Sequence, residues 1–277
     1  DVHFGRMTMD FGRRRLIARN DFRNTSNAFD GVHWQIGQDK TWRFRAFFVE
    51  PVIRDDVKLD EQHNKSIFWG TYLESKHFPW FQMDAYYLGL NDHRTYSTYG
   101  LRLYKDPKQA EMDYEVESAW QTGTRGVTNH FAHFQHLDLG YTFDIPWSPR
   151  FLIHYDYASG DRKPGDGQDE GFDTLFGARR FEYMPTGTFG PFFRTNLSSP
   201  GWRMIVTPSQ DWTIQLKQRF WYLAESTDSF GSSGLRDSTG GSGNDLGHDL
   251  ELRANWAVSS NMFFDAGYVH WFKGSYF

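Results

Sequence analysis

From Gly247 to Val258 the sequence alternates without interruption between apolar and polar side chains. The apolar positions are Leu250, Leu252, Ala254, Trp256 and Val258, and the polar positions between them are Asp249, Glu251, Arg253 and Asn255. Successive side chains of a strand point to opposite faces of a sheet. This segment therefore predicts a β-strand with one apolar face and one charged face.

The same alternation recurs along the chain, and many of its apolar positions are aromatic. The clearest segments are 42–48, 112–120, 137–143, 151–157 and 212–222. A soluble β-sandwich buries its apolar faces in a shared core and would explain one or two such strands. A transmembrane β-barrel needs the alternation in every strand, with lipid outside and water inside. The recurrence favours an all-β antiparallel transmembrane barrel over a soluble sandwich or lectin.

The composition is compatible with a barrel. The 277 residues include 18% aromatic side chains and no cysteine, and the mean hydropathy is −0.68. No run of about 18 apolar residues is present, which excludes a transmembrane helix, whereas a barrel carries its membrane signal in the alternation. The net charge of −5 argues against general nucleic-acid binding.

Turn signals divide the chain into about 13 predicted strands within a single domain, residues 1–277. The strands cover 2–11, 28–37, 41–53, 66–74, 80–90, 96–104, 111–121, 132–144, 150–158, 198–207, 212–225, 247–258 and 262–272. Short turns alternate with connections that are mostly long, at 12–27, 54–65, 122–131, 159–197 and 226–246. Outer-membrane barrels have short periplasmic turns and long extracellular loops, so the long connections are predicted to face outward.

The predicted strand number bears on barrel closure. An odd number of strands cannot close with every neighbour antiparallel, and bacterial barrels have even strand numbers. The last predicted strand, 262–272, would also end on the outer side of the membrane. We therefore expect a fragment that lacks the closing C-terminal strand and an even number of N-terminal strands. The edge strands 2–11 and 262–272 are not expected to pair with each other.

Residues 5–32 resemble the opening motif of the alginate export family of outer-membrane β-barrels. The matching positions are Gly5, Arg6, Gly12, Arg15, Leu16, Ile17, Asp21, Phe22, Arg23, Asn24, Phe29, Asp30 and Gly31, whereas Met7 stands where the family usually has Gln. Similar segments follow in order at 157–161, 171–176, 246–252 and 267–277. The resemblance implies a bacterial outer-membrane barrel of about 18 strands, surrounded by lipid and lipopolysaccharide.

The resemblance also implies passive transport of an acidic polysaccharide such as alginate, or a related anionic solute, with periplasmic secretion partners. The alternative is an uptake porin for small solutes. Rings of Arg or Lys select for anions, and the predicted pore-lining residues are Arg6, Arg43, Arg45, Arg102, Arg203, Lys217, Arg219, Arg253 and Glu251. Further acids share the inward face, at Asp10, Asp84, Asp113, Glu115, Glu117, Asp138, Asp156, Asp249 and Asp265. The lumen is therefore predicted to be mixed in charge, and these side chains could simply pair with each other across the wall.

Two other stretches predict residues at the mouth of the pore. Arg13, Arg14, Arg15, Arg19 and Arg23 form a basic stretch that could focus anions at the entrance, or bind lipopolysaccharide, or lie solvated in a loop. Loop 159–197 is too long and too aromatic to be a plain connector, and we expect part of it to fold into the lumen. Its basic residues Arg179, Arg180 and Arg194 would then line a constriction.

Enzymatic and metal sites receive little support. The acidic part of loop 159–197 lacks the ligand spacing of a calcium loop, and alternation places His133 on the face opposite His130 and His136. A hydrolase would need a nucleophile beside a base such as His136 or His154, but no Gly-x-Ser-x-Gly motif is present. The sequence therefore predicts a channel without enzymatic activity, metal or cofactor.

Overall fold

The computed structural model describes residues 1–19, 26–38, 41–53, 61–62, 66–178, 183, 192–231 and 233–277. Within them, one antiparallel sheet runs in sequence order. Its strands are β1 (Val2–Met7), β2 (Phe29–Gln38), β3 (Trp42–Ile53), β5 (Ile67–Ser75), β6 (Gln82–Asn91), β7 (Arg94–Lys105), β8 (Met112–Arg125), β9 (Thr128–Thr142), β10 (Arg150–Ala158), β12 (Leu197–Ser209), β13 (Trp212–Tyr222), β14 (Asp245–Ser259) and β15 (Met262–Lys273). Two short strands lie off this path: β4 (Glu61–Gln62) pairs with β3, and β11 (Gln168–Asp169) pairs in parallel with β9.

The thirteen long strands of the described chain confirm the predicted strand number and order. Two boundaries were predicted wrongly. Residues 122–131 are not a long loop, because β8 and β9 continue to a tight hairpin around Gly126, a glycine with φ of 60°. The first strand ends at Met7 rather than at residue 11, because the chain then leaves the wall and folds inward.

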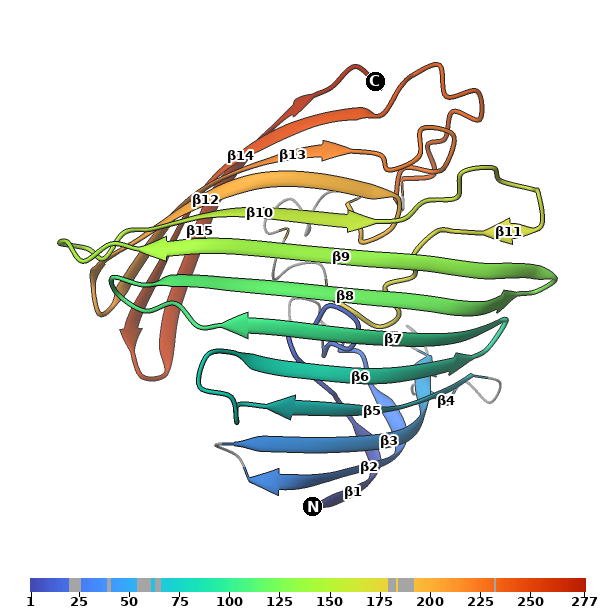
Figure 1. Ribbon diagram of the computed structural model, residues 1–277, viewed down its shortest axis with the longest axis horizontal. Coiled ribbons are helices and arrows are strands. Elements are labelled where there is room, and N and C mark those ends of the chain that lie inside the picture. The colour runs from blue at the N-terminus through green and yellow to red at the C-terminus, as the bar shows by residue number, and fades with distance from the viewer. Residues whose placement is uncertain are drawn as a thin grey trace.

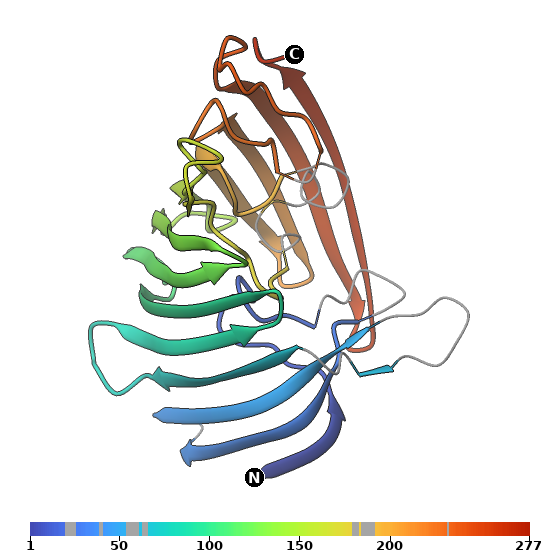
Figure 2. The same cartoon turned by 90° about the vertical axis from the view of Figure 1, so that its right-hand side faces the viewer.

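The sheet bends into a trough, from β1 at the bottom of Figure 2 through β9 to β15 on the right. In the part of the chain that the structure describes, β1 and β15 stand at opposite edges and do not pair, as predicted (Figure 1). Backbone groups in lipid must be hydrogen-bonded within the protein, so these two edges are the sites at which closure must occur. No helix among the described residues is long and apolar enough to cross a membrane.

The two faces of the wall differ as the alternation predicts. On the outer face, Leu252 is 53% exposed and Phe48 is 59% exposed. On the inner face, Arg45, Lys217 and Glu251 are all buried. The apolar set therefore points away from the hollow of the trough and the ionised set points into it.

At several positions of the wall, an aromatic ring packs over a glycine of the neighbouring strand. Tyr86 of β6 pairs with Gly100 of β7, and a Cβ atom at residue 100 would overlap the tyrosine ring. Because glycine has no side chain, the ring can lie flat against the wall and its hydroxyl can reach Glu117 at 2.6 Å. His154 of β10 lies across Gly201 of β12 in the same way.

The apolar core lies inside the trough rather than between two layers. Residues 8–19, which we call the inward segment, run into the hollow, where Phe11 packs on Phe47 and Tyr72. Part of the connection between β10 and β12 enters from the same end, because β1 and β10 both finish at the edge of the sheet where the long connections lie. The two meet at a parallel bridge between Ile17 and Phe176, where Phe176 N donates to Leu16 O at 3.0 Å and Ala18 N donates to Phe176 O at 3.1 Å.

The pairing of Tyr86 with Gly100 predicts a sensitive position. Gly100→Val would force the Tyr86 ring off the wall and break its bond to Glu117. We expect the free energy of unfolding to fall by about 1–3 kcal/mol, measured by urea titration of the refolded protein in micelles. Gly267→Ala is the control, because a Cβ there would make only ordinary contacts of 3.4 Å or more. Equal stability of the two variants would contradict the packing argument.

The outward position of Leu252 predicts a different cost. Leu252→Arg would place a charge on the lipid face, and we expect a loss of about 2–4 kcal/mol if the residue lies near the bilayer midplane. The measurement is the free energy of folding into lipid vesicles. A loss that disappears when the protein is folded in short-chain detergent micelles would identify lipid as the cause, whereas no loss in vesicles would place Leu252 outside the membrane.

Candidate functional site: the charged lumen wall

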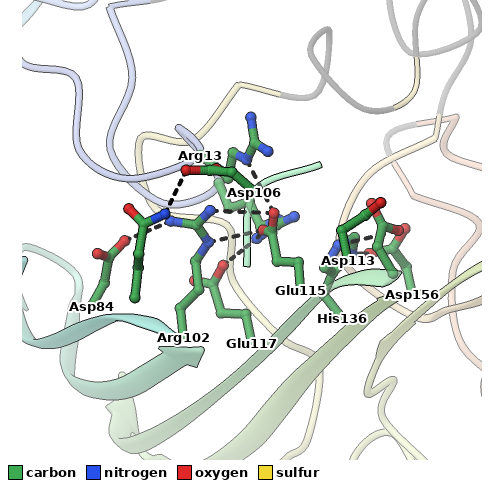
Figure 3. A network of polar contacts seen from close by, with 12 residues as sticks. Arg13, Asp84, Arg102, Asp106, Asp113, Glu115, Glu117, His136 and Asp156 are labelled. Atoms are coloured by element: carbon green, nitrogen blue, oxygen red, sulfur yellow. Dashed lines mark hydrogen bonds and ion pairs between the residues drawn. The ribbon is translucent and has the colours of Figure 1, made fainter. Parts of the chain in front are cut away.

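Three carboxylates and one arginine meet on the inner face of β6, β7 and β8. Arg102 donates from Nη1 to Asp84 Oδ2 at 2.8 Å and from Nε to Glu115 Oε1 at 2.9 Å. Glu117 lies two positions further along β8. All four side chains are buried, and Figure 3 shows them gathered at one place on the wall.

The inward segment supplies two more arginines to this place. Arg15 Nη1 lies 2.5 Å from Glu115 Oε1 and also bonds Glu117. Arg13 Nε donates to Glu115 Oε2 at 3.1 Å. Arg15 is 3% exposed, whereas the side chain of Arg13 is 56% exposed and faces the open hollow. We call the six residues the lumen cluster: Arg13, Arg15, Asp84, Arg102, Glu115 and Glu117.

Two tyrosines hold the carboxylates of the lumen cluster in place. Tyr72 O–H donates to Asp84 Oδ2 at 2.9 Å, and Tyr86 O–H donates to Glu117 Oε1 at 2.6 Å. The two rings stack on each other with centroids 5.3 Å apart. Hydrogen bonds to ionised groups are stronger than neutral ones, so the phenols fix the direction in which the carboxylates meet the arginines.

Ion pairs continue around the wall, between neighbouring strands or between strands two apart in the sheet. Asp156 of β10 accepts from His136 Nδ1 at 2.7 Å and from Arg219 Nη1 at 2.6 Å. The remaining pairs of the inner face are Arg45–Glu74, Arg150–Asp113, Lys217–Glu251 and Arg253–Asp265. The pair Arg6–Asp30 is in register with Glu50 on the face of Phe48, so Arg6 does not line the pore as predicted. The inner face is thus a set of acid–base pairs rather than a ring of cations.

Two adjoining cavities lie beside the lumen cluster, at the end of the trough where the short turns are. They have volumes of about 320 and 150 Å³ and share Arg13, Tyr104 and Asp106; we call them the vestibule. Its basic lining residues are Arg13, Arg15, Arg43, Lys76, Arg102, Lys105, Arg150, Arg203 and Arg219, and its acidic lining residues are Glu74, Asp84, Asp106, Asp113, Glu115 and Asp138. The vestibule is therefore net cationic among the described residues.

A third cavity of about 660 Å³ opens at the end with the long loops, and we call it the basin. Its charged lining residues are Arg125, Arg236, Asp161, Asp169, Asp173 and Asp228, with Phe172 and Phe193 on its wall. Burial, together with the nearby carboxylates of Asp228 and Asp169, raises the pKa of Asp161. The two ends of the described lumen thus carry opposite net charge.

The predicted site residues take different positions. Arg43, Arg102, Arg203 and Arg219 line the vestibule, whereas Lys217 and Glu251 are buried against each other. The inward segment places Arg13 and Arg15 on the lumen wall, not at a mouth, and Arg19 is exposed beside Asp10. Arg194 is 1% exposed and donates to Ala178 O at 2.9 Å, so it stabilises the connection between β10 and β12 to which it belongs. Arg23, Arg179 and Arg180 lie outside the described residues.

Sequence reasoning missed several members of the site. Arg150 lines the vestibule and pairs with Asp113, and the alternation could have found it, because it shares a face with His154 and Asp156. Tyr104 could be found only from the structure: the guanidinium of Arg102 lies 3.7 Å from its ring centroid. The partnership of Arg15 with Glu115 has no local signal, since 100 residues separate them.

A family model for alginate export matches residues 1–277, the whole chain. The chain belongs to the alginate export family. It is therefore a channel protein of the bacterial outer membrane. No match was found among curated proteins.

Solved structures share the fold at low sequence identity. The chain is similar to Pseudomonas aeruginosa OccK5 (OpdH), with a TM-score of 0.68, 11% identity and coverage of 99% of this chain and 73% of that chain. It is also similar to OccK11 (OpdR) from the same organism, with a TM-score of 0.66, 12% identity and coverage of 98% of this chain and 72% of that chain. For the P. aeruginosa outer membrane protein OprD, the TM-score is 0.65 and the identity 14%, with coverage of 99% of this chain and 70% of that chain. These likenesses support the barrel fold of this alginate export family member.

The hydrolase hypothesis finds no support in this arrangement. His136 bonds Asp156 and lies 3.5 Å from Asp138. In the described part of the chain, neither His136 nor His154 is hydrogen-bonded to a Ser or Thr hydroxyl that could act as a nucleophile. Membership of the alginate export family agrees with a channel rather than an enzyme.

The buried pair Lys217–Glu251 predicts a stability difference. Lys217→Met would leave a buried carboxylate without its cation and is expected to cost about 3–5 kcal/mol, whereas the double variant Lys217→Met/Glu251→Leu should recover most of this loss. Arg6→Met is the matched control, because the Arg6–Asp30 pair is partly exposed and should contribute about 1 kcal/mol or less. Urea unfolding measures all three. A Lys217→Met variant no less stable than Arg6→Met would refute the buried-pair argument.

Proposed function

We propose that this protein is a passive outer-membrane channel for an acidic polysaccharide of the alginate type, which it engages through the vestibule. The observation that carries the proposal is the excess of basic over acidic side chains lining that cavity. A cavity lined mainly by one sign of charge raises the local concentration of the opposite ion. Family membership supports the same class of solute.

The chemistry of the vestibule suits a uronate sugar. Guanidinium groups bind carboxylates through paired, charge-assisted hydrogen bonds, and Arg13 and Arg43 line the cavity with partly exposed side chains. Tyr104 and Asp106 add a hydroxyl and a carboxylate that can bond sugar hydroxyls. The acids of the vestibule keep the binding weak, which a channel requires if its solute is to leave.

The opposite charges of the two ends suit transport toward the long loops. If those loops face outward, as the sequence predicts, the cationic vestibule opens to the periplasm and the acidic basin lies at the exit. A polyanion would then be attracted at entry and repelled at release. Contacts with lipopolysaccharide and with periplasmic secretion partners stay predictions.

An uptake porin for small solutes is the second candidate, and one observation favours it. The inward segment and residues 172–178 meet across the hollow, and the vestibule cavities beside them are small, about 320 and 150 Å³. These cavities hold single sugars, whereas a polymer would require the two inward parts to separate.

Planar-bilayer conductance tests the proposal and separates the candidates. We expect oligouronates to block the current, and Arg43→Gln/Lys76→Gln to weaken the block about tenfold, since each surface charge contributes up to about 1 kcal/mol. Arg236→Gln, in the basin, is the control and should not weaken it. Free permeation of neutral monosaccharides without any oligouronate block would overturn the proposal and favour the small-solute porin.

A further inference from the structure

The wall of the lumen cluster is acidic without the inward segment. Strands β6, β7 and β8 contribute Asp84, Glu115 and Glu117 but only one cation, Arg102. Neighbouring acids on the wall have basic partners of their own: Arg150 pairs with Asp113, Arg219 and His136 with Asp156, and Arg45 with Glu74. The wall of the cluster therefore carries two carboxylates more than it has arginines.

The inward segment supplies the missing charges. Arg13 and Arg15 reach Glu115 and Glu117 from a part of the chain about 100 residues away. Arg14 and Asp10 of the same segment pair with each other at 3.1 Å and do not alter the balance. With the segment in place, the three acids of the lumen cluster face three arginines.

We propose that the inward segment, rather than the barrel wall, determines the charge selectivity of the channel. Arg13 and Arg15 neutralise the excess acid of the lumen cluster, which leaves the vestibule around it net cationic. Arg13 is the residue that a solute meets, because its side chain is half exposed and lines both cavities of the vestibule. Arg15 is buried and pairs with both Glu115 and Glu117, so it changes the charge of the wall without contacting the solute. The inference rests on the channel assignment and not on the identity of the solute.

The segment is suited to this role by its attachment. It is outside the strands, between the end of β1 and the start of β2, so its side chains do not follow the alternation of the wall. Arg45 Nη1 donates to Asp10 O at 3.1 Å and Phe11 packs on Phe47, which fixes the segment against the wall. Its charges are therefore held at a set position in the lumen.

Reversal potentials in a KCl gradient at pH 8 test the inference without any sugar. Arg13→Gln/Arg15→Gln should raise the ratio of potassium to chloride permeability by about threefold or more, because Glu117 loses its arginine and Glu115 keeps only Arg102. The quadruple variant that adds Glu115→Gln/Glu117→Gln has the net charge of the original protein and should return to the original ratio. Arg253→Gln/Asp265→Asn, a distant balanced pair, is the control and should leave the ratio unchanged.

Two further measurements keep the inference falsifiable if a variant folds poorly. Glu117→Gln alone removes a wall charge while Arg15 stays, and should shift the ratio toward chloride. Arg13→Lys/Arg15→Lys keeps both charges and should retain the original ratio. An unchanged ratio in Arg13→Gln/Arg15→Gln, or a quadruple variant that stays cation-selective, would overturn the inference. Failure of oligouronate block would overturn the proposed solute alone, since these potentials are measured with KCl only.

Discussion

Charge pairing on the inner face of the wall is the constraint on which the rest of this structure depends. Strand alternation places most ionised side chains of the wall on the side that the inward parts cover. A charge removed from water is costly unless an opposite charge and hydrogen bonds replace the water. Partners therefore come from the adjacent strand, as for Lys217 with Glu251, or from a distant segment, as for Arg15 with Glu115.

The same constraint connects the fold to transport. Since the pairs along the wall cancel, the net charge that a solute meets comes from residues outside the regular pairing: the turns, the inward segment and the long loops. Lys76 and Lys105 add positive charge near the short turns, and Asp161 and Asp228 add negative charge at the other end. Outside the lumen cluster the charges of the wall largely pair with each other, and the added segments contribute to the net charge of each end.

The fold could be predicted from the sequence because a period of two is a local signal that each strand repeats. Strand order, facing and the lack of pairing between the edge strands followed from it. The failures occurred where local signals mislead. Residues 122–131 contain two glycines and read as a loop, yet the strands extend to Arg125 and Thr128. Met9 and Phe11 alternate with polar residues as in a strand, but they lie beyond the end of β1 and are buried inside the hollow.

The site was less predictable, for a physical reason. Alternation identifies which side chains face the lumen, and so it found Arg102, Glu115 and Glu117 separately. It cannot say which charges meet, because that depends on the path of a segment with no period of its own. Arg13 and Arg15 were therefore expected at a mouth, where a basic stretch would attract anions. Because they lie on the wall, both arginines neutralise carboxylates there. Only Arg13, whose side chain is half exposed, can also contact a solute. In this channel, whether a cation of the sequence can meet a solute therefore depends on how far its side chain stays exposed after it has paired with the acids of the wall.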